Sequence, residues 1–443
     1  TTLERRDFER DQPGFSGWNR NNDEMVPFWQ RAHRYCDLGA YQYDARALGP
    51  DDPQFWQLTD DRTIEPVVLR QSPPTRFGEK YSASLADSRT IHAWLWTNAV
   101  TVSTMPGAER ETVETRTLDG TERRFQARAV VMAAGAIEST RLVLWSNAKN
   151  ATQAGSAGTL LGRCYMDHLA GGIGTLHFDR HMPDQVQWTP IDTFADEGVP
   201  LHFGLHVKED VQRDLGLTNI IFHALPIADS REKRLRRKRS RDAVDSLANL
   251  VKWTIGREMS ARFRPADAYC EMTMNADDFV VDTVDRVLGP KGAKQALIRF
   301  EAEERPGRTN GVDLHPAERD ALGVPRPILT WKPSDDDLEA VRLSALQLGR
   351  AFGEMEIGRL ELDTKENMPF RDVVTAWHQL GTMRMATSPT AGVTDQNCKV
   401  YGAGELYVAG GATFPTGGRA NPTLTIVALA IRLGDHLKGR MLG

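Results

Sequence analysis

This sequence lacks long apolar runs, and its cysteines do not have the spacing of a metal-binding or disulfide motif. Its longest apolar stretch, residues 424–433, is far shorter than the roughly 20 residues of a membrane-spanning helix and contains Arg432. No two cysteines have CxxC or CxxH spacing, so we expect reduced thiols, with neither a disulfide framework nor a zinc knuckle. The cysteines are Cys36, Cys164, Cys270 and Cys398. We therefore expect no membrane span and no metal site.

A strong charge of either sign is also missing. The formal net charge is −5, which provides no field that would gather phosphate backbones, so we expect no nucleic-acid partner. The first residues have no apolar signal-peptide core and do not begin with Met. We expect that the beginning of the protein precedes this chain, and that the location is cytoplasmic.

The one local exception is a basic run at 231–241, REKRLRRKRSR. Such a run is typical of a nuclear-localisation or nucleic-acid patch, or of a solvated helix or loop, and the acidic whole favours the second interpretation. With 443 residues, of which 40% are hydrophobic and 26% charged, the composition is that of a soluble globular protein. The length predicts two lobes rather than one compact core.

Local signals predict several elements in the first third of the chain. Asn22 and Asp23 can cap a helix that ends at Leu38 and Gly39. Alternating and apolar patterns predict strands over 99–104, 111–118 and 122–134, with Asp119-Gly120 as a hairpin turn. The region before residue 82 is expected to pack peripherally.

A strand, a glycine turn and a helix are predicted around Gly135. Residues 129–135, AVVMAAG, form a continuous apolar run of the kind found in strands buried on both faces of an α/β sheet. Ile137, Arg141 and Leu144 then follow with helical spacing. Such a junction places backbone N–H groups at the carboxyl edge of a sheet, where phosphates and nucleotides bind. An ordinary strand-to-helix corner is the other interpretation.

A second junction of this kind lies near the C-terminus. Residues 406–410, LYVAG, predict a strand, and a loop rich in Gly and Thr leads to a helix marked by Asn421 as N-cap and Pro422 at the first helical position. The helix is apolar nearly all round, so we expect it to be buried. Its N–H groups need a partner, which is either an anionic ligand, such as the pyrimidine edge of a reduced flavin, or water and backbone carbonyls.

A histidine upstream of this helix is the candidate base. His378 begins the segment HQLGTMRM at 378–385. Histidine titrates near pH 6.5, so it can accept a proton near neutrality, although a lone histidine before a Gly-Thr turn is commonly structural. Its companion at the Asn421 helix start favours a catalytic role.

These segments together resemble the glucose-methanol-choline (GMC) flavin oxidoreductases, over nearly the whole chain. The resemblance rests on HQLGTMRM at 378–385, GVTDQNCKVYG at 392–402, LYVAG at 406–410 and PTGGRANPTLT at 415–425. Two earlier stretches agree, AVVMAAGAIES at 129–139 and LGRCYMDH at 161–168. The resemblance favours a cofactor role for the turn at Gly135. It implies an α/β fold with a discontinuous Rossmann-like FAD-binding domain and an α+β substrate domain built on an antiparallel sheet.

The resemblance also implies a function. The His–Asn pair is similar to that of the pyranose oxidase and sugar dehydrogenase branches, so His378 would take the hydroxyl proton and Asn421 would bind the same oxygen. The cofactor implied is FAD, and the reaction is oxidation of an alcohol on a sugar, glycoside or cyclitol, with oxygen or a quinone-like acceptor. If the Asn421 side chain caps its own helix, however, it cannot also face substrate. The flavin contacts implied are Val100, Ala134, Gly135, Ser139, Ala409, Gly410, Asn421, Pro422, Thr423 and Leu424.

One feature of the family is missing. No GxGxxG unit for the ADP part of FAD occurs in this sequence, because GAG at 402–404 and GIG at 172–174 lack the third glycine. The chain is then a clipped enzyme, a subunit whose FAD-binding half is a second polypeptide, or a flavin-free, non-catalytic relative. An uncovered sheet would expose apolar edges, so we expect a covering element. The expected division is a peripheral segment 1–81, FAD-binding parts 82–174 and 371–443, and a substrate domain 175–370.

Overall fold

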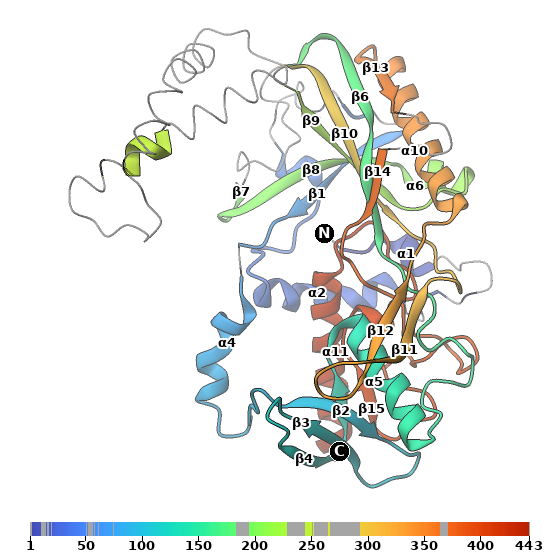
Figure 1. Cartoon of the computed structure of the whole chain (residues 1–443). Coiled ribbons are helices and arrows are strands. Elements are labelled where there is room, and N and C mark those ends of the chain that lie inside the picture. Colours follow the sequence, from blue (N-terminus) through green and yellow to red (C-terminus); the bar gives the residue numbers. More distant parts are fainter. Residues whose placement is uncertain are drawn as a thin grey trace.

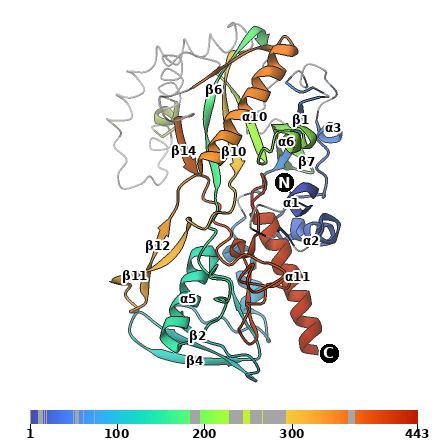
Figure 2. The ribbon, with the colours of Figure 1, turned by 90° about the vertical axis from the view of Figure 1, so that its right-hand side faces the viewer.

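The structure is a computed structural model in which the chain forms two regions along its long axis (Figure 1). One region holds a large sheet and α10, and the other holds α2, α5 and α11 with three small sheets (Figure 2). The helices are α1 Arg5–Glu9, α2 Asn22–Tyr35, α3 Ala45–Leu48, α4 Phe77–Ala86, α5 Gly135–Asn150, α6 Glu209–Asp214, α10 Asp335–Glu354 and α11 Thr423–Leu442. The structure describes residues 2–9, 15, 17–18, 20–49, 51, 56, 58–60, 62–73, 75–182, 195–227, 244–249, 251, 265, 293–363 and 371–442.

The large sheet has eight strands and is antiparallel. Its strand order is β1-β8-β9-β10-β6-β13, and β14 also pairs with β6 while β7 pairs with β8. The strands are β1 Ile64–Arg70, β6 His168–Met182, β7 Ala195–Asp196, β8 Val199–Val207, β9 Ile220–Pro226, β10 Ala293–Glu303, β13 Gly358–Leu362 and β14 Arg371–Thr375.

Alternation along β10 gives this sheet two different faces. Ile298, Phe300 and Ala302 are buried in a core that also contains Val341 and Leu348 of α10. Successive side chains of a strand point to opposite faces, so Arg299, Glu301 and Glu303 lie on the other face. The register pairs Arg299 with His223, Glu301 with Ala170 and Glu303 with His168. Residues opposite each other share a face, so the second face is lined with polar and titratable groups.

The strand and glycine turn predicted at 129–135 are present, but the strand is not covered on both sides. β5 (Val130–Met132) pairs in parallel with β15 (Leu406–Val408), and these two strands form a sheet of their own. Val131 is 41% exposed, because no further strand or helix of the described residues covers that face. Gly135 has a φ of 80° and opens α5 as predicted.

The predicted hairpin is confirmed. β3 (Glu111–Arg116) and β4 (Glu122–Ala127) pair antiparallel around Gly120, and β2 (Asn98–Ser103) completes their sheet. The strand predicted over 122–134 is therefore two strands, β4 and β5. A further hairpin is formed by β11 (Gly311–Arg319) and β12 (Pro325–Thr330).

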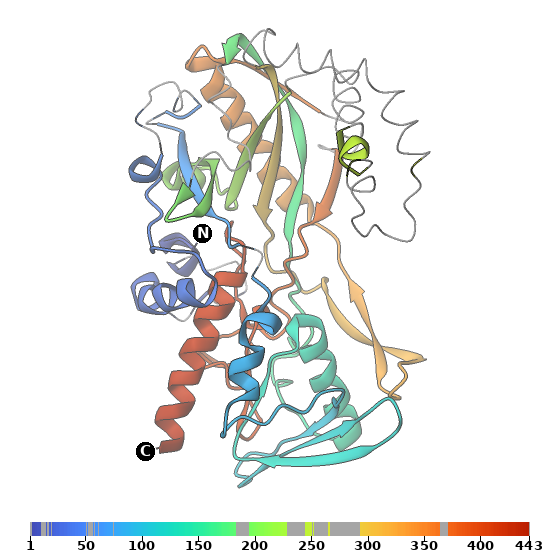
Figure 3. The ribbon, with the colours of Figure 1, turned by 90° about the vertical axis from the view of Figure 1, so that its left-hand side faces the viewer.

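Helix α2 packs on α11, the last helix of the chain (Figure 3). Trp29 of α2 is completely buried and donates a hydrogen bond from Nε1 to Oγ1 of Thr425, at 3.2 Å. The helix was predicted from Asn22, but its cap is Asn21, whose side chain accepts from the backbone of Glu24. α4, in contrast, has no buried residue.

The mixed α/β fold with a large antiparallel sheet agrees with the expected class. Within the described ranges, no helix has both the length and the apolar character required to cross a bilayer. The three described cysteines are buried and unpaired. The basic run at 231–241 lies outside the described residues, and the expected boundaries at 82, 175 and 371 stay predictions.

Candidate active site

The candidate base His378 follows β14 and is held by one carboxylate. Oδ1 of Asp167 accepts hydrogen bonds from three backbone nitrogens, those of His168 at 2.8 Å, Ala376 at 3.1 Å and His378 at 2.9 Å. Asp167 is 1% exposed, so these bonds are shielded from water. Its side chain therefore fixes the start of β6 and the turn before His378 against each other.

A second histidine touches the ring of His378. Nδ1 of His168 lies 2.9 Å from Nδ1 of His378, and the two rings meet edge to face with centroids 4.9 Å apart. Burial, followed by the neighbouring His378, lowers the pKa of His168 to about 4. Burial also lowers the pKa of His378, which the Asp167 carboxylate partly counteracts. Both rings are therefore neutral at pH 7, and His378 is able to accept a proton.

The segment after His378 is joined to the loop that follows β15. Thr382 donates from Oγ1 to the carbonyl of Ala136, at 3.1 Å, so the same segment also contacts the first turn of α5. Three backbone hydrogen bonds make the junction with 411–413, from Gly381 to Gly411 at 3.0 Å, Met383 to Ala412 at 2.8 Å and Met385 to Thr413 at 2.8 Å. The position of His378 thus depends on the turn at the end of β15.

Residues 411–420, which lead to Asn421, are all buried. The backbone N–H of Gly418 donates to Oε1 of Glu303 on β10, at 3.2 Å. Nε1 of Trp18 donates to Oγ1 of Thr416, at 2.8 Å. The large sheet and the N-terminal segment therefore both hold the loop.

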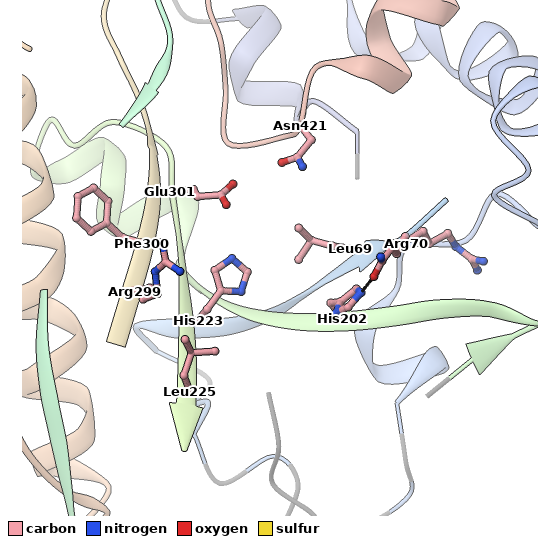
Figure 4. Close-up of a pocket in the computed structure, with 10 residues that line it drawn as sticks. Leu69, Arg70, His202, His223, Leu225, Arg299, Phe300, Glu301 and Asn421 are labelled. Atoms are coloured by element: carbon pink, nitrogen blue, oxygen red, sulfur yellow. Dashed lines mark hydrogen bonds between the residues drawn. The ribbon is translucent and has the colours of Figure 1, made fainter. Parts of the chain in front are cut away.

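Asn421 does not cap its own helix. α11 begins at Thr423, and the carbonyl of Pro422 accepts the first helical hydrogen bond, from Ile426 at 2.8 Å. The expected cap is thus displaced by one residue. Asn421 is exposed, and Figure 4 shows its carboxamide directed into a cavity. The conflict between capping and facing substrate is therefore absent.

The cavity has a volume of about 380 Å³ and lies on the polar face of the large sheet. Figure 4 shows Glu301 and His223 across from Asn421. Burial raises the pKa of Glu301, with Arg299 acting in the opposite direction, and burial lowers the pKa of His223 to about 4. The lining residues are Leu69, Arg70, Gln71, His202, His223, Leu225, Arg299, Phe300, Glu301 and Asn421.

The cavity and the histidine pair are connected through β10. Glu301 lines the cavity, and Glu303, two residues along the same strand, is the register partner of His168. Two residues of a strand span about 7 Å, so Glu303 and its partner His168 lie about that far along β10 from Glu301, and neither histidine is among the residues that line the cavity. In the described part of the chain no hydrogen bond joins His378 to Asn421, and their action on one oxygen stays a prediction.

The edge formed by β5 and β15 fits a flavin cofactor. Because the strands are parallel, their carboxyl ends place Gly135 and Gly410 at one edge. A Cβ built on either glycine would meet no atom within 4 Å, and Gly410 has φ 145° and ψ 179°, a conformation that side chains disfavour. Ala134, just before α5, provides no side-chain cap. Open backbone at an uncapped helix start is what a phosphate-bearing cofactor requires.

The other predicted flavin contacts differ in exposure. Thr423, at the start of α11, is exposed, and Ala409 is half-buried. Val100, Pro422 and Leu424 are buried. Ser139 is also buried, and its Oγ accepts a hydrogen bond from the backbone of Ala134 at 3.2 Å, so it shapes the glycine turn from inside.

Sequence reasoning assigned no role to four residues of this region. Asp167 and His168 lie at the end of the LGRCYMDH stretch that carried the family resemblance, so a signal was present. Glu301 and Glu303 lie on β10, outside the quoted motifs, and only the register of the sheet brings them to the site.

Comparison with known proteins shows what the chain is similar to. The C-terminal model of the GMC oxidoreductases matches residues 306–430. The chain is 33% identical over 147 residues to a 2-methyl-1,2-propanediol dehydrogenase of Mycolicibacterium austroafricanum, covering 32% of this chain and 25% of the relative. It is 26% identical over 468 residues to the fructose dehydrogenase large subunit of Gluconobacter japonicus, covering 94% of this chain and 73% of the relative.

The fold similarity is broader than the sequence similarity. The structure of pyridoxine 4-oxidase from Mesorbium loti has a TM-score of 0.51 and 15% identity, covering 94% of this chain and 77% of that one. The chain spans only about a quarter of the length of the diol dehydrogenase. The family-model match, the relatives and the shared fold nevertheless point the same way. The chain is similar to the GMC oxidoreductases, whose family model matches its residues 306–430.

Proposed function

We propose that this chain, with FAD bound, oxidises an alcohol group on a sugar, glycoside or cyclitol to a carbonyl. The observation that carries the proposal is the contact of His378 with the buried His168, whose register partner Glu303 is two residues along β10 from Glu301 in the lining of a polar cavity. GMC oxidoreductases, which this chain resembles, use FAD to oxidise alcohols, and the open glycine edge of β5 and β15 fits that cofactor.

The side chains have complementary tasks. Neutral His378 accepts the hydroxyl proton, and the carboxamide of Asn421 donates a hydrogen bond to the same oxygen. Base and donor must converge on one oxygen, because the C–H bond releases hydride only as the O–H becomes alkoxide-like. FAD, when bound, accepts that hydride. Gly135, Gly410 and Thr423 are the residues we expect to hold the cofactor.

The lining of the cavity favours a polyhydroxylated substrate. In the described part of the chain, the side chains of His223, Arg299, Glu301 and Asn421 form no hydrogen bond with the protein, so they are available to several hydroxyl groups at once. A volume of about 380 Å³ lies within the range of small-molecule sites. The fructose dehydrogenase relative acts on a sugar, whereas the diol dehydrogenase relative supports a simple diol as the second candidate.

The proposal includes partners. Oxygen or a quinone-like acceptor would take the two electrons, and a further segment or second polypeptide would provide the GxGxxG unit. The cytoplasmic location expected from the sequence stays a prediction.

His378→Ala tests the proposed base. In the complete native protein, we expect the rate of flavin reduction by substrate to fall at least roughly a hundredfold, as for a lost general base. Anaerobic stopped-flow absorbance measures this rate. His177→Ala is the control, because that side chain is 42% exposed and pairs with Glu361 away from the cavity. An unchanged rate in His378→Ala would refute the assignment.

Two cheaper measurements separate the alternatives. The native assembly should show the visible bands of an oxidised flavin, and their absence would favour a flavin-free, non-catalytic subunit. A panel of sugars and glycosides should reduce the flavin faster than 1,2-diols and simple alcohols. If 1,2-diols reduced the flavin faster, the proposed substrate would be a simple diol and not a sugar.

A further inference from the structure

We propose that His168 is a positioning residue that sets the tautomer and orientation of His378, leaving Nε2 of His378 free as the proton acceptor. The inference rests on the proposed function, because it explains how the proposed base, His378, is oriented and which of its ring nitrogens carries the proton. It is carried by the contact between the two Nδ1 atoms, at 2.9 Å, and by the burial of His168, which is 1% exposed.

The contact requires the two rings to carry their protons unequally. A hydrogen bond between two ring nitrogens needs one N–H and one lone pair, and each neutral imidazole has one of each. If His168 donates, His378 must carry its proton on Nε2 and cannot accept one there. If His378 donates from Nδ1, its Nε2 keeps a lone pair and is available to a hydroxyl proton. The contact therefore couples catalytic competence to the tautomer of His168.

The surroundings of His168 favour the second arrangement. Its Nε2 is buried against Gly417, where an added Cβ would lie 3.3 Å away, and has no well-directed hydrogen bond. The backbones of Gly417 and Gly418 counteract the fall in the pKa of His168, so they favour a proton on the ring. With its single proton on Nε2, His168 offers the Nδ1 lone pair to His378. This is the logic of a base oriented by a buried partner.

Two carboxylates hold the histidine pair in place, but neither can select the tautomer of His378. Asp167 binds the backbone nitrogens of both histidines, and Glu303 favours the protonated form of His168 while holding Gly418. Neither carboxylate has a hydrogen bond to a ring nitrogen of His378 in the described part of the chain. His168 is therefore the group that can select the tautomer of His378.

The experiment compares His168→Leu and His168→Asn in the complete protein with flavin bound. Nitrogen-15 NMR of labelled histidine reports which ring nitrogen of His378 carries the proton, independently of turnover. We expect the proton on Nδ1 in the wild type, a shift towards Nε2 in His168→Leu, and the wild-type tautomer in His168→Asn, because its carbonyl can accept the same hydrogen bond. Flavin reduction should slow at least roughly tenfold in His168→Leu, with kcat affected more than KM, and recover in His168→Asn.

His33→Leu is the matched control. His33 is also buried, and its ring contacts the Gly39 carbonyl at 3.1 Å and the Tyr43 hydroxyl at 3.0 Å, so its loss tests the general cost of removing a buried histidine. His33→Leu should lower stability without changing the His378 tautomer. A wild-type His378 protonated on Nε2, or a tautomer unaffected by His168→Leu, would overturn the inference. A wild type whose flavin no alcohol reduces would instead defeat the proposed function, while the tautomer would still be measured.

Discussion

Glu4 and Arg419 form an ion pair in which Nε of Arg419 lies 3.0 Å from Oε1 of Glu4, although the residues are 415 positions apart. The side chains are 24% and 7% exposed. Asn219 donates a further hydrogen bond to Oε2 of Glu4, at 3.0 Å. Because Arg419 is two residues before Asn421, this pair ties the N-terminal segment to the loop that positions the candidate substrate-binding amide.

Glu4→Gln should destabilise the protein by about 2 kcal/mol at pH 7, the scale of a hydrogen bond to a charged group. Burial opposes ionisation of Glu4, but Arg419 and His206 outweigh it and lower its pKa to about 2. The stabilisation is therefore complete above the ordinary pKa of a glutamate, about 4.3, and is lost as the pH falls towards 2. Urea unfolding at pH 7 and pH 3 measures it. Asp23→Asn is the control, because its contact with Arg5 is exposed and should contribute little. Equal effects of both variants would contradict this account.

Glu301→Gln should weaken sugar binding. The variant keeps the size of the side chain and removes its charge, so we expect KM to rise roughly tenfold with little change in kcat, the loss of one hydrogen bond to a charged group. Because burial raises the pKa of Glu301, the KM of the wild type should fall as the pH rises through that pKa, and the variant should lose this dependence. Steady-state kinetics across pH tests both points. Glu361→Gln is the control, with a side chain 74% exposed. A KM that does not change would remove Glu301 from the substrate site.

Local signals were sufficient for much of the fold. The hairpin at Gly120, the helix after Gly135 and the strand before Gly410 depend on turn and capping preferences that act over a few residues, and the structure has all of them. Burial was harder to predict. The apolar run at 129–135 indicated a strand covered on both faces, yet Val131 is exposed, because the number of neighbouring strands is not encoded in the strand itself. α11 is likewise apolar nearly all round, although Thr423 and Ala430 are exposed.

The site required the tertiary structure. His168 and His378 are 210 residues apart, and their contact depends on where β6 begins in the sheet. The capping preference also gave the wrong role to the Asn421 side chain, because Pro422 and not Asn421 occupies the N-cap position of α11. His378 and Asn421 were thus identified from the sequence, and Asp167 lies within a stretch that carried the family resemblance, whereas Glu301 could only be assigned from the register of the folded sheet.

Gly410→Ala should lower both the stability of the protein and its affinity for flavin, because Gly410, just after β15, has φ 145° and ψ 179°. An added Cβ would meet no atom within 4 Å, so the whole effect comes from the backbone, about 1–3 kcal/mol. Gly434→Ala is the matched control, because it also adds a methyl group in open space but lies within α11, where alanine is favoured by about 0.5–1 kcal/mol. Thermal unfolding and the ratio of flavin to protein absorbance measure the two effects. If the turn binds the cofactor, Gly410→Ala should lose flavin while Gly434→Ala retains it. A Gly410→Ala protein that is destabilised but fully loaded with flavin would show that the turn has a structural role alone.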